Sequence, residues 1–468
     1  MQNAVCPQAL DAALRRAKLD KMEAGHATNI VYGVLRHRAQ LDHALVQLTS
    51  PKFTARTPLA TVCALRIGAY EVLHMATPEY AAVNEAVALV GSATARRRFA
   101  NGVLRGLIRR RDACEIIVPA EDESLSPLGA LSVETCTPEW LLHKLCPPAG
   151  ALASLEEVGE WARKTQQQPG LTLRINRLRA TRDQVQEALQ QAAQIETLEP
   201  MGLTCALLLP EGGGHVPSLP FFAAGWWSVQ DVGAQCVALL AAPEPGSRVL
   251  DLCAAPGGKT TNLAELMGDM GTLVSIELHE RKARLVREAC DRLGLTCVHV
   301  HAADATDAEG LRRLLASRAS ECEPVEGERT SDDPPWLADT VVVDAPCSGS
   351  GTLRRNPEHR HRPMDDERMA ALRGLQRRLL ASAASCVRVG GTLTYSVCSP
   401  LLEETDDLVS AFLKARAGDF EVVRVDDPAL VPYAASSEAL GGERMCVRTW
   451  THLHPADSHF AVKLRRLA

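Results

Sequence analysis

From about residue 229 the sequence alternates short apolar runs with amphipathic stretches, and this alternation limits the possible fold more than any other feature. The runs suited to buried strands cover residues 248–253, 272–277, 297–301, 340–344 and 392–396. Helical patterns separate them, among others at 280–293 and 366–387. Such a repeat builds a parallel sheet with helices on both faces, so we expect a doubly wound α/β domain. Two further runs, at 421–425 and 459–464, predict strands that close the chain.

The first 115 residues show the apolar spacing of helices instead, which predicts an all-α bundle of about five short helices. The last of these, RRRFANGVLRGLIRRR, is expected to bury Phe99, Val103, Leu104 and Leu107. Residues 116–135 contain Pro and Ser and predict a linker. The sequence therefore predicts three domains: all-α (1–135), small α/β connecting (136–228) and larger α/β (229–468).

Composition excludes several classes of protein. The 468 residues are 46% apolar and 23% charged, which excludes wholesale disorder. No apolar run is long enough to span a membrane, and the N-terminus lacks the apolar core of a secretory signal, so we expect a cytoplasmic protein without membrane contact. Residues 1–111 hold 16 Lys and Arg against 7 Asp and Glu, within a chain of net charge −6. A basic region on an acidic body suits a polyanionic partner, although a solvated helix surface would carry the same charges.

The fifteen cysteines are odd in number, and no two of them form a Cys-x-x-Cys pair. This pattern favours neither a disulfide framework nor a zinc or redox site, and we expect no metal. Most of these cysteines are therefore expected to be small buried apolar side chains.

The first chemical motif is VLDLCAAPGGKTTNLAELM at 249–267, which predicts a strand, a turn rich in Gly, Ala and Pro, and a helix. Such a unit forms the ligand-binding edge of an open α/β sheet, where Gly257 and Gly258 let the backbone approach a ligand closely. The turn lacks the earlier glycine of a phosphate-binding loop, which disfavours an ATPase. Two acids follow later strands: Glu277 could accept ribose hydroxyls, and Asp304 could contact a base or cap a helix.

Two cysteines follow the next strands of the predicted sheet. The segment VVVDAPCSGSG ends a strand at Asp344 and places Cys347 in a turn, and TYSVCSP places Cys398 in the loop after another strand. Because ligands bind at the carboxyl edge of a parallel sheet, these two thiols are candidates for chemistry.

Two thiols and a carboxylate beside a nucleoside site suit methylation of cytosine at C5. A thiolate that adds at C6 makes C5 able to attack a methyl sulfonium; a base then removes the C5 proton and the thiol is eliminated. An acid such as Asp344 would stabilise the adduct at ring N3. One cysteine attacks and the other assists its release, and the spacing does not rank the two.

Taken together, DLCAAPGGKTT, DAPCSGSG and TYSVCSP resemble the RNA cytosine-5 methyltransferases, and the segment with AVNEAV and FANGVLRGLIRR resembles a NusB-like domain. This pairing is similar to the bacterial small-subunit (16S) rRNA methyltransferase B family over nearly the whole chain. The resemblance implies a Rossmann-like, S-adenosylmethionine-dependent methyltransferase domain preceded by an all-α NusB-like domain. It also implies 16S ribosomal RNA as the partner, and we expect a monomer.

The resemblance assigns roles to individual residues. It implies that Cys398 is the nucleophile and that Cys347 is linked to product release. The implied cofactor-contacting positions are Cys253, Ala254, Ala255, Pro256, Gly257, Gly258, Lys259, Glu277, Asp304 and Asp344. It also brings Gln230 and Asp231 near the site. We expect RNA phosphates to contact Arg354, Arg355, Arg97 and Arg110, with a solvated helix face as the alternative for the arginine triplets.

The sequence departs from the family pattern in three places. Val397 replaces a small polar residue before the nucleophile, DSHF at 457–460 lacks a glycine, and 317–338 is a longer acidic stretch expected to form a surface loop. Two alternatives stay open: tRNA as the methyl acceptor, and a non-catalytic RNA-binding or antitermination factor, which would need neither thiol. A DNA cytosine methyltransferase is disfavoured because a second cysteine follows the next strand.

Overall fold

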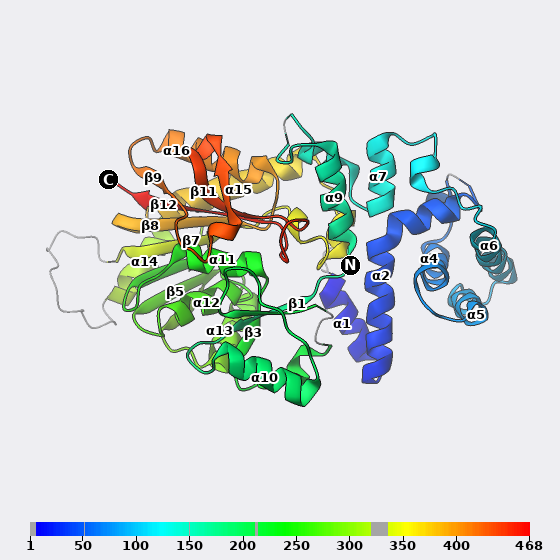
Figure 1. The fold of residues 1–468 in the computed structure, drawn as a ribbon, viewed down its shortest axis with the longest axis horizontal. Coiled ribbons are helices and arrows are strands. Elements are labelled where there is room, and N and C mark those ends of the chain that lie inside the picture. Colours follow the sequence, from blue (N-terminus) through cyan, green and yellow to red (C-terminus); the bar gives the residue numbers. More distant parts are fainter. Residues whose placement is uncertain (1–5, 51, 149, 211–213, 320–335) are drawn as a thin grey trace. The chain divides into compact units, whose positions relative to one another are not determined.

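The computed structural model describes residues 6–50, 52–148, 150–210, 214–319 and 336–468. The chain forms two compact units (Figure 1). Unit 1 comprises Met1–Gln167 and Leu353–Arg362, and unit 2 comprises Gln168–Thr352 and Pro363–Ala468. The expected domain borders at 135/136 and 228/229 do not coincide with this division.

The N-terminal part of unit 1 is a helical bundle, as the sequence predicts. Its helices are α1 (Cys6–Ala17), α2 (Lys21–Val46), α3 (Phe53–Arg56), α4 (Leu59–His74), α5 (Glu79–Leu89) and α6 (Thr94–Asp112). Apolar residues of α2, α4, α5 and α6 share one core. The expected burial is wrong for Phe99, which is 40% exposed, because the buried stripe of α6 begins one residue later at Ala100 and continues through Val103, Leu104 and Leu107.

The rest of unit 1 contains η1 (Pro119–Glu121), α7 (Pro127–Thr135), α8 (Glu139–Leu145), α9 (Leu155–Gln166) and, from a distant part of the sequence, η4 (Pro357–His361). The predicted linker is therefore wrong in its second half, because Ser126 caps α7 and a proline occupies its first turn. The buried Arg360 of η4 donates hydrogen bonds to the carbonyl oxygens of Thr135 at 3.0 Å and Thr165 at 2.7 Å. These bonds fix η4 to the helices around it.

Unit 2 is built on a mixed sheet, which has nine strands in the described part of the chain, in the order β10-β11-β12-β8-β7-β4-β5-β6, with β9 also paired to β12. The parallel strands are β4 (Arg248–Leu252), β5 (Thr272–Glu277), β6 (Val298–Ala302), β7 (Ala338–Asp344) and β8 (Val387–Val397). The antiparallel part comprises β9 (Phe420–Val423), β10 (Ala434–Ser437), β11 (Gly442–Thr449) and β12 (His459–Arg466). The parallel prediction is confirmed for the five central strands, and the two further predicted strands, at 421–425 and 459–464, lie in the antiparallel part as β9 and β12.

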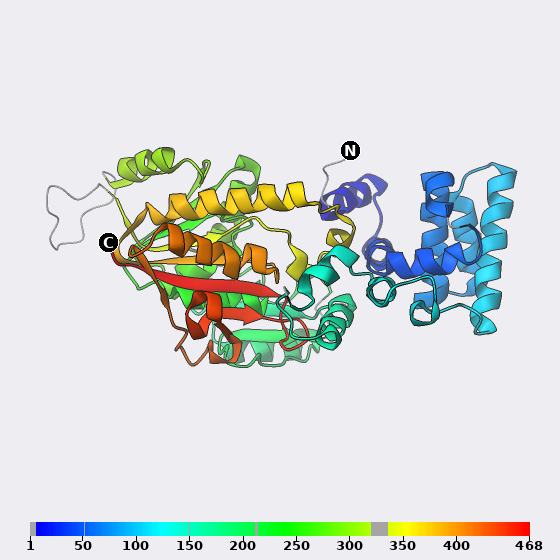
Figure 2. The same ribbon diagram turned by 90° about the horizontal axis from the view of Figure 1, so that it is seen from above.

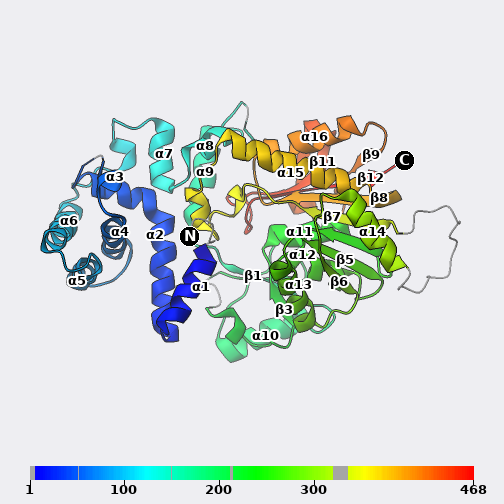
Figure 3. The ribbon, with the colours of Figure 1, turned by 180° about the vertical axis from the view of Figure 1, so that it is seen from behind.

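Helices cover both faces of this sheet (Figures 2 and 3). One core contains residues of α11 (Val232–Ala241), α12 (Gly258–Leu266) and α13 (Glu280–Leu293). The other contains residues of α14 (Ala308–Ala319), α15 (Asp366–Ala384) and α16 (Asp406–Ala415). Successive strand residues alternate between them, since Leu250 and Leu252 belong to the second core and Val249 to the first. The doubly wound architecture is therefore confirmed.

The predicted loop at 317–338 lies mainly outside the described residues. Its first residues, 317–319, end α14, and at its other end Trp336 is buried and Ala338 begins β7. The loop prediction is therefore wrong at both margins.

A small antiparallel sheet of unit 2 precedes the large one. It contains β1 (Leu171–Ile175), β2 (Ala206–Leu209) and β3 (Trp227–Val229), in the order β2-β1-β3. Helix α10 (Arg182–Ala193) follows β1 and begins with a capping box formed by Thr181 and Gln184. This sheet contributes to the site through a single arginine of β1.

Candidate active site

The loop after β4 lies at the point where the strand order reverses. Strand β4 pairs with β5 on one side and with β7 on the other, and ligands of open α/β sheets bind at such a point. In this loop Cys253 has a φ of 65° and Gly257 a φ of 105°. A Cβ at Gly257 would also meet Val286 Cα at 3.2 Å, so both conformation and space require glycine there. The backbone before α12 can therefore come close to a ligand.

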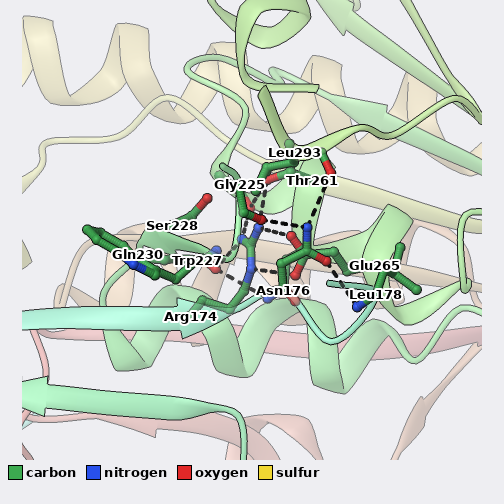
Figure 4. Close-up of polar contacts among 12 residues, drawn as sticks. Arg174, Asn176, Leu178, Gly225, Trp227, Ser228, Gln230, Thr261, Glu265 and Leu293 are labelled. Atoms are coloured by element: carbon green, nitrogen blue, oxygen red, sulfur yellow. Dashed lines mark hydrogen bonds and ion pairs between the residues drawn. The ribbon is translucent and has the colours of Figure 1, made fainter. Parts of the chain in front are cut away.

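A buried arginine holds this loop from the small sheet (Figure 4). Arg174 of β1 donates to the carbonyl oxygen of Gly258 at 2.7 Å and to the hydroxyl of Thr261 at 2.9 Å. It also forms a bidentate ion pair with Glu265, at 2.7 and 3.0 Å, and both side chains are almost fully buried. Gln230 accepts another hydrogen bond from Arg174 at 2.7 Å, which places this predicted residue beside the loop. Sequence patterns did not point to Arg174, because a single arginine in a strand looks like a surface residue.

Two of the predicted acids lie at the ends of the next strands. Glu277 ends β5, is 7% exposed, and accepts the backbone N–H of His279 through one carboxylate oxygen. Asp304 follows β6, is exposed, and accepts both the backbone N–H and the hydroxyl of Thr306, which lowers its pKa. Asp304 does not cap the next helix. Asp307 does, since its side chain accepts a hydrogen bond from the N–H of Gly310. Asp304 is thus a charged group held in a local turn.

Asp251, near the end of β4, is a fully buried acid that was not among the predicted site residues. One of its oxygens accepts the hydroxyl of Thr260 at 2.5 Å. Its other oxygen has no hydrogen-bond partner among the described residues. Burial raises the pKa of Asp251 to about 7, because so few donors replace water around the charged form.

Asp344, the predicted acid at the end of β7, lies between two donors. The ammonium of Lys259 is 2.7 Å from one carboxylate oxygen, and the hydroxyl of Ser396 donates to the other at 2.9 Å. Burial lowers the pKa of Lys259, but the charge and hydrogen bond of Asp344, together with the nearby Cys398 and Asp251, hold that pKa above its ordinary value. The two groups therefore form a charged pair at the edge of the sheet.

The two candidate cysteines meet beside this pair. The Sγ atoms of Cys347 and Cys398 are 3.4 Å apart, which is hydrogen-bonding distance for thiols. The hydrogen bond to Cys398 and burial raise the pKa of Cys347 well above its ordinary value. The contact joins the two thiols directly, and either sulfur can be the donor.

The segment DSHF packs directly against the cysteine loops. The N–H of Ser458 donates to the carbonyl oxygen of Gly351, whose own N–H donates to the carbonyl oxygen of Cys398, each at 3.0 Å. The N–H of Asp457 donates to the carboxylate of Asp231, the other predicted residue near the site. Neither Asp457 nor Ser458 has a positive φ, so the segment does not need the family's glycine.

Val397, the other departure, is buried at the end of β8 and pairs with Phe460 of β12. An apolar side chain therefore suits this position.

The arginines expected to contact RNA occupy different environments. Arg97 is exposed on α6, whereas Arg110 on the same helix donates to the carbonyl oxygen of Gln47 at 3.1 Å. Arg354 is only 7% exposed, and Arg355 is half-buried. Arg97 is thus the best placed of the four for a phosphate.

No helix in the described ranges is both long and apolar enough to cross a membrane. In the same ranges no three His, Cys, Asp or Glu side chains are grouped so as to hold a metal ion.

The fold and this edge define a class: a Rossmann-like methyltransferase domain joined to a helical domain. The family model for the 16S rRNA methyltransferase RsmB/F matches residues 238–465, and the NusB family model matches residues 2–109. A relative from Synechocystis, "Probable ribosomal RNA small subunit methyltransferase B", is 33% identical over 410 residues, 87% of this chain and 84% of that protein. The chain therefore belongs to the RsmB/F family.

Solved structures share the fold. The crystal structure of PH0851 has a TM-score of 0.73 at 24% identity and covers 97% of this chain and 93% of its own. The structure of NSun6 from Pyrococcus horikoshii with SFG has a TM-score of 0.55 at 18% identity, with coverages of 68% and 96%.

Proposed function

We propose that this protein transfers a methyl group from S-adenosylmethionine to C5 of a cytosine in 16S ribosomal RNA, through a covalent bond between Cys398 and C6 of the base. One observation carries the proposal: the contact between the sulfur atoms of Cys398 and Cys347, 3.4 Å apart, beside the Lys259–Asp344 pair. Binding alone would need neither thiol. The family and the name of its Synechocystis relative support ribosomal RNA as the substrate class.

The loop after β4 and the acid of β5 fit S-adenosylmethionine. In the described part of the chain, Glu277 accepts one backbone N–H and keeps acceptor capacity for the two ribose hydroxyls. Gly258 leaves room beside the backbone at the start of α12, since the nearest atom that a Cβ there would meet is the amide nitrogen of Gln230, at 3.8 Å. When bound, this molecule supplies the methyl group as a sulfonium. Asp304 is the candidate for contact with the adenine base, because its carboxylate can accept a hydrogen bond from the amino group.

The residues of the chain would handle the remaining steps. The thiolate of Cys398 would form a bond to C6, and the electron pair at C5 would take the methyl group while the methyl–sulfur bond of the sulfonium breaks and its electron pair stays on the departing thioether. A base would then take the C5 proton, and the electron pair of that C–H bond would restore the C5–C6 double bond as the C6–S bond breaks. The carboxylate of Asp344, oriented by Lys259 and Ser396, would accept a hydrogen bond from a ring protonated at N3. Cys347 would return a proton to the departing sulfur of Cys398, to which it is already hydrogen-bonded.

The RNA must present an unstacked cytosine to Cys398, which costs a few kcal/mol if the base is paired. An unpaired loop is therefore the cheaper target. Arg97 and Arg355 stay our candidates for phosphate contacts, while the burial of Arg354 and the bond of Arg110 favour structural roles for those two.

The test is methyl transfer from labelled S-adenosylmethionine to RNA and ribosomal particles from cells that lack the protein, with bisulfite mapping of the product. We expect one labelled 16S cytosine with the wild type and a loss of at least about 1,000-fold in Cys398→Ala, because the nucleophile is gone. Cys347→Ala should accumulate a covalent RNA adduct that survives denaturing electrophoresis.

The matched control is Cys386→Ala, a buried thiol of the core. It should lose some stability but keep the product and form no adduct. Label in tRNA alone would change the substrate, and no 5-methylcytosine on any RNA would refute the enzymatic proposal and favour an RNA-binding factor.

A further inference from the structure

One buried carboxylate beside the cysteine loops, that of Glu404, takes part in none of the steps above. Glu404 ends η5 (Leu402–Glu404), the short helix that follows the Cys398 loop, and its side chain is fully buried. Glu404 stands in a run of acids at 403–407, and such runs usually form a solvated face. A carboxylate buried this completely needs a reason, because it gives up its hydration.

Its hydrogen bonds reach both cysteine loops at once. The residue after Cys347, Ser348, donates its backbone N–H at 2.9 Å and its hydroxyl at 2.6 Å. The residue after Cys398, Ser399, donates its hydroxyl at 2.5 Å. A single rigid group therefore binds the neighbour of each thiol, and both loops share one anchor.

Helix α15 adds a third contact to this anchor. Gln376 donates its side-chain amide to Glu404 and to the carbonyl oxygen of Pro346, each at 3.0 Å. Pro346 directly precedes Cys347, so the turn that carries this thiol is held on both sides.

We propose that Glu404 is a positioning residue, which fixes the two cysteine loops at sulfur–sulfur contact and places a negative charge near Cys347. The donors to Glu404 are a backbone amide, two hydroxyls and a carboxamide, all neutral, so its charge is not cancelled locally. The hydrogen bond to Cys398 and burial are the largest causes that raise the pKa of Cys347, and the charge of Glu404 adds to them. The inference deepens the proposed function, since it rests on Cys398 as the nucleophile.

Glu404→Gln separates charge from geometry. The amide keeps one oxygen for the Ser348 N–H and the Gln376 amide, and its NH₂ group can donate to hydroxyls that rotate to accept. Glu404→Ala removes both charge and hydrogen bonds. The control is Asp406→Asn, a buried carboxylate two residues away that binds Ser437 and Arg448 and contacts neither cysteine loop.

The first readout needs no RNA: iodoacetamide labelling of Cys347 against pH, followed by peptide mass spectrometry. In Glu404→Gln we expect labelling of Cys347 to begin about one pH unit lower than in the wild type, because one nearby negative charge is gone. The alkaline limb of the methylation rate should move in the same direction. Asp406→Asn should leave both pH profiles in place, and Glu404→Ala should lose at least about 100-fold in kcat at unchanged KM for S-adenosylmethionine.

Wild-type labelling and pH–rate profiles in Glu404→Gln would overturn the inference. If that variant fails to fold, Ser399→Ala removes only the Cys398 arm and should slow methylation without moving the labelling of Cys347; an unchanged rate would overturn the anchoring role. Full activity in Cys398→Ala would instead refute the proposed function, whereas the labelling of Cys347 would still report on the charge of Glu404.

Discussion

Glu265 and Glu404 are both buried carboxylates of unit 2, yet the protein surrounds them in opposite ways. Glu265 forms a bidentate ion pair with Arg174 beneath the loop after β4. Glu404 binds only neutral donors beneath the cysteine loops. An ion pair cancels its own charge and serves to hold two elements together, whereas a carboxylate among neutral donors keeps a net charge that neighbouring groups feel. The comparison distinguishes a structural carboxylate from one that acts on chemistry.

The largest expected effect comes from breaking the ion pair. Arg174→Met leaves Glu265 buried without its cation and should lower the free energy of unfolding by about 3–5 kcal/mol. The double variant Arg174→Met/Glu265→Leu should recover most of that loss, because the unpaired charge is gone. Urea denaturation measures both. A loss below about 1 kcal/mol in the single variant would show that the pair does not carry the structural role assigned to it.

An intermediate effect is expected at Asp251, which has one hydroxyl donor and one oxygen without a partner. Its pKa is about 7 in the folded protein, against about 3.9 in an unfolded chain. Between these values the folded state binds more protons than the unfolded state, so this group's contribution to stability falls as pH rises from about 4 to about 7.

Asp251→Asn removes this dependence and can still accept the Thr260 hydroxyl. Compared with the wild type, the variant should gain about 1–3 kcal/mol between pH 5 and pH 8, measured by denaturation at both values. Parallel stability profiles for the two proteins would contradict the prediction. Asp251 would then also be a buried, charged carboxylate without a bound cation. In that case an uncancelled charge would not be special to Glu404, and the contrast with Glu265 would not identify a functional carboxylate.

The smallest effect is expected from a single neutral donor. Ser348→Ala removes one hydroxyl from Glu404 but keeps the backbone N–H, and should cost about 1 kcal/mol. Ser437→Ala, which removes a hydroxyl from the ion-paired Asp406, is the matched comparison. Thermal unfolding should show similar small losses in the two variants, and Ser348→Ala should leave the pH dependence of Cys347 labelling in place, because the charge of Glu404 remains. A shifted profile would contradict the role given to that charge.

Periodicity predicted the regular parts of the fold well. Strand β5 and helix α13 begin and end at the expected residues, since long apolar patterns leave one register for burial. The antiparallel strands β10 and β11 were not predicted, because AASS and the exposed start of β11 carry little apolar alternation. Phe99 shows the same limit on one residue: its exposure depends on where the stripe of α6 begins.

The site was predictable where residue type and strand end coincide, as for Asp344, Cys347 and Cys398. Glu404 and Arg174 could not be found this way, because burial of a charged residue depends on partners far away in sequence. The order of the two thiols follows from the family resemblance, because neither the spacing in the sequence nor the sulfur–sulfur contact distinguishes them.

The segment Leu353–Arg362 bears on how such a chain can be rearranged by evolution. It begins six residues after Cys347 and belongs to unit 1, where Arg360 satisfies carbonyl oxygens of Thr135 and Thr165. A single recombination event near residue 167 would therefore separate Arg360 from the carbonyl oxygens that accept its hydrogen bonds. The guanidinium would then need other acceptors or water. We expect the two units to be inherited together, with Arg360 and its acceptors changing in concert.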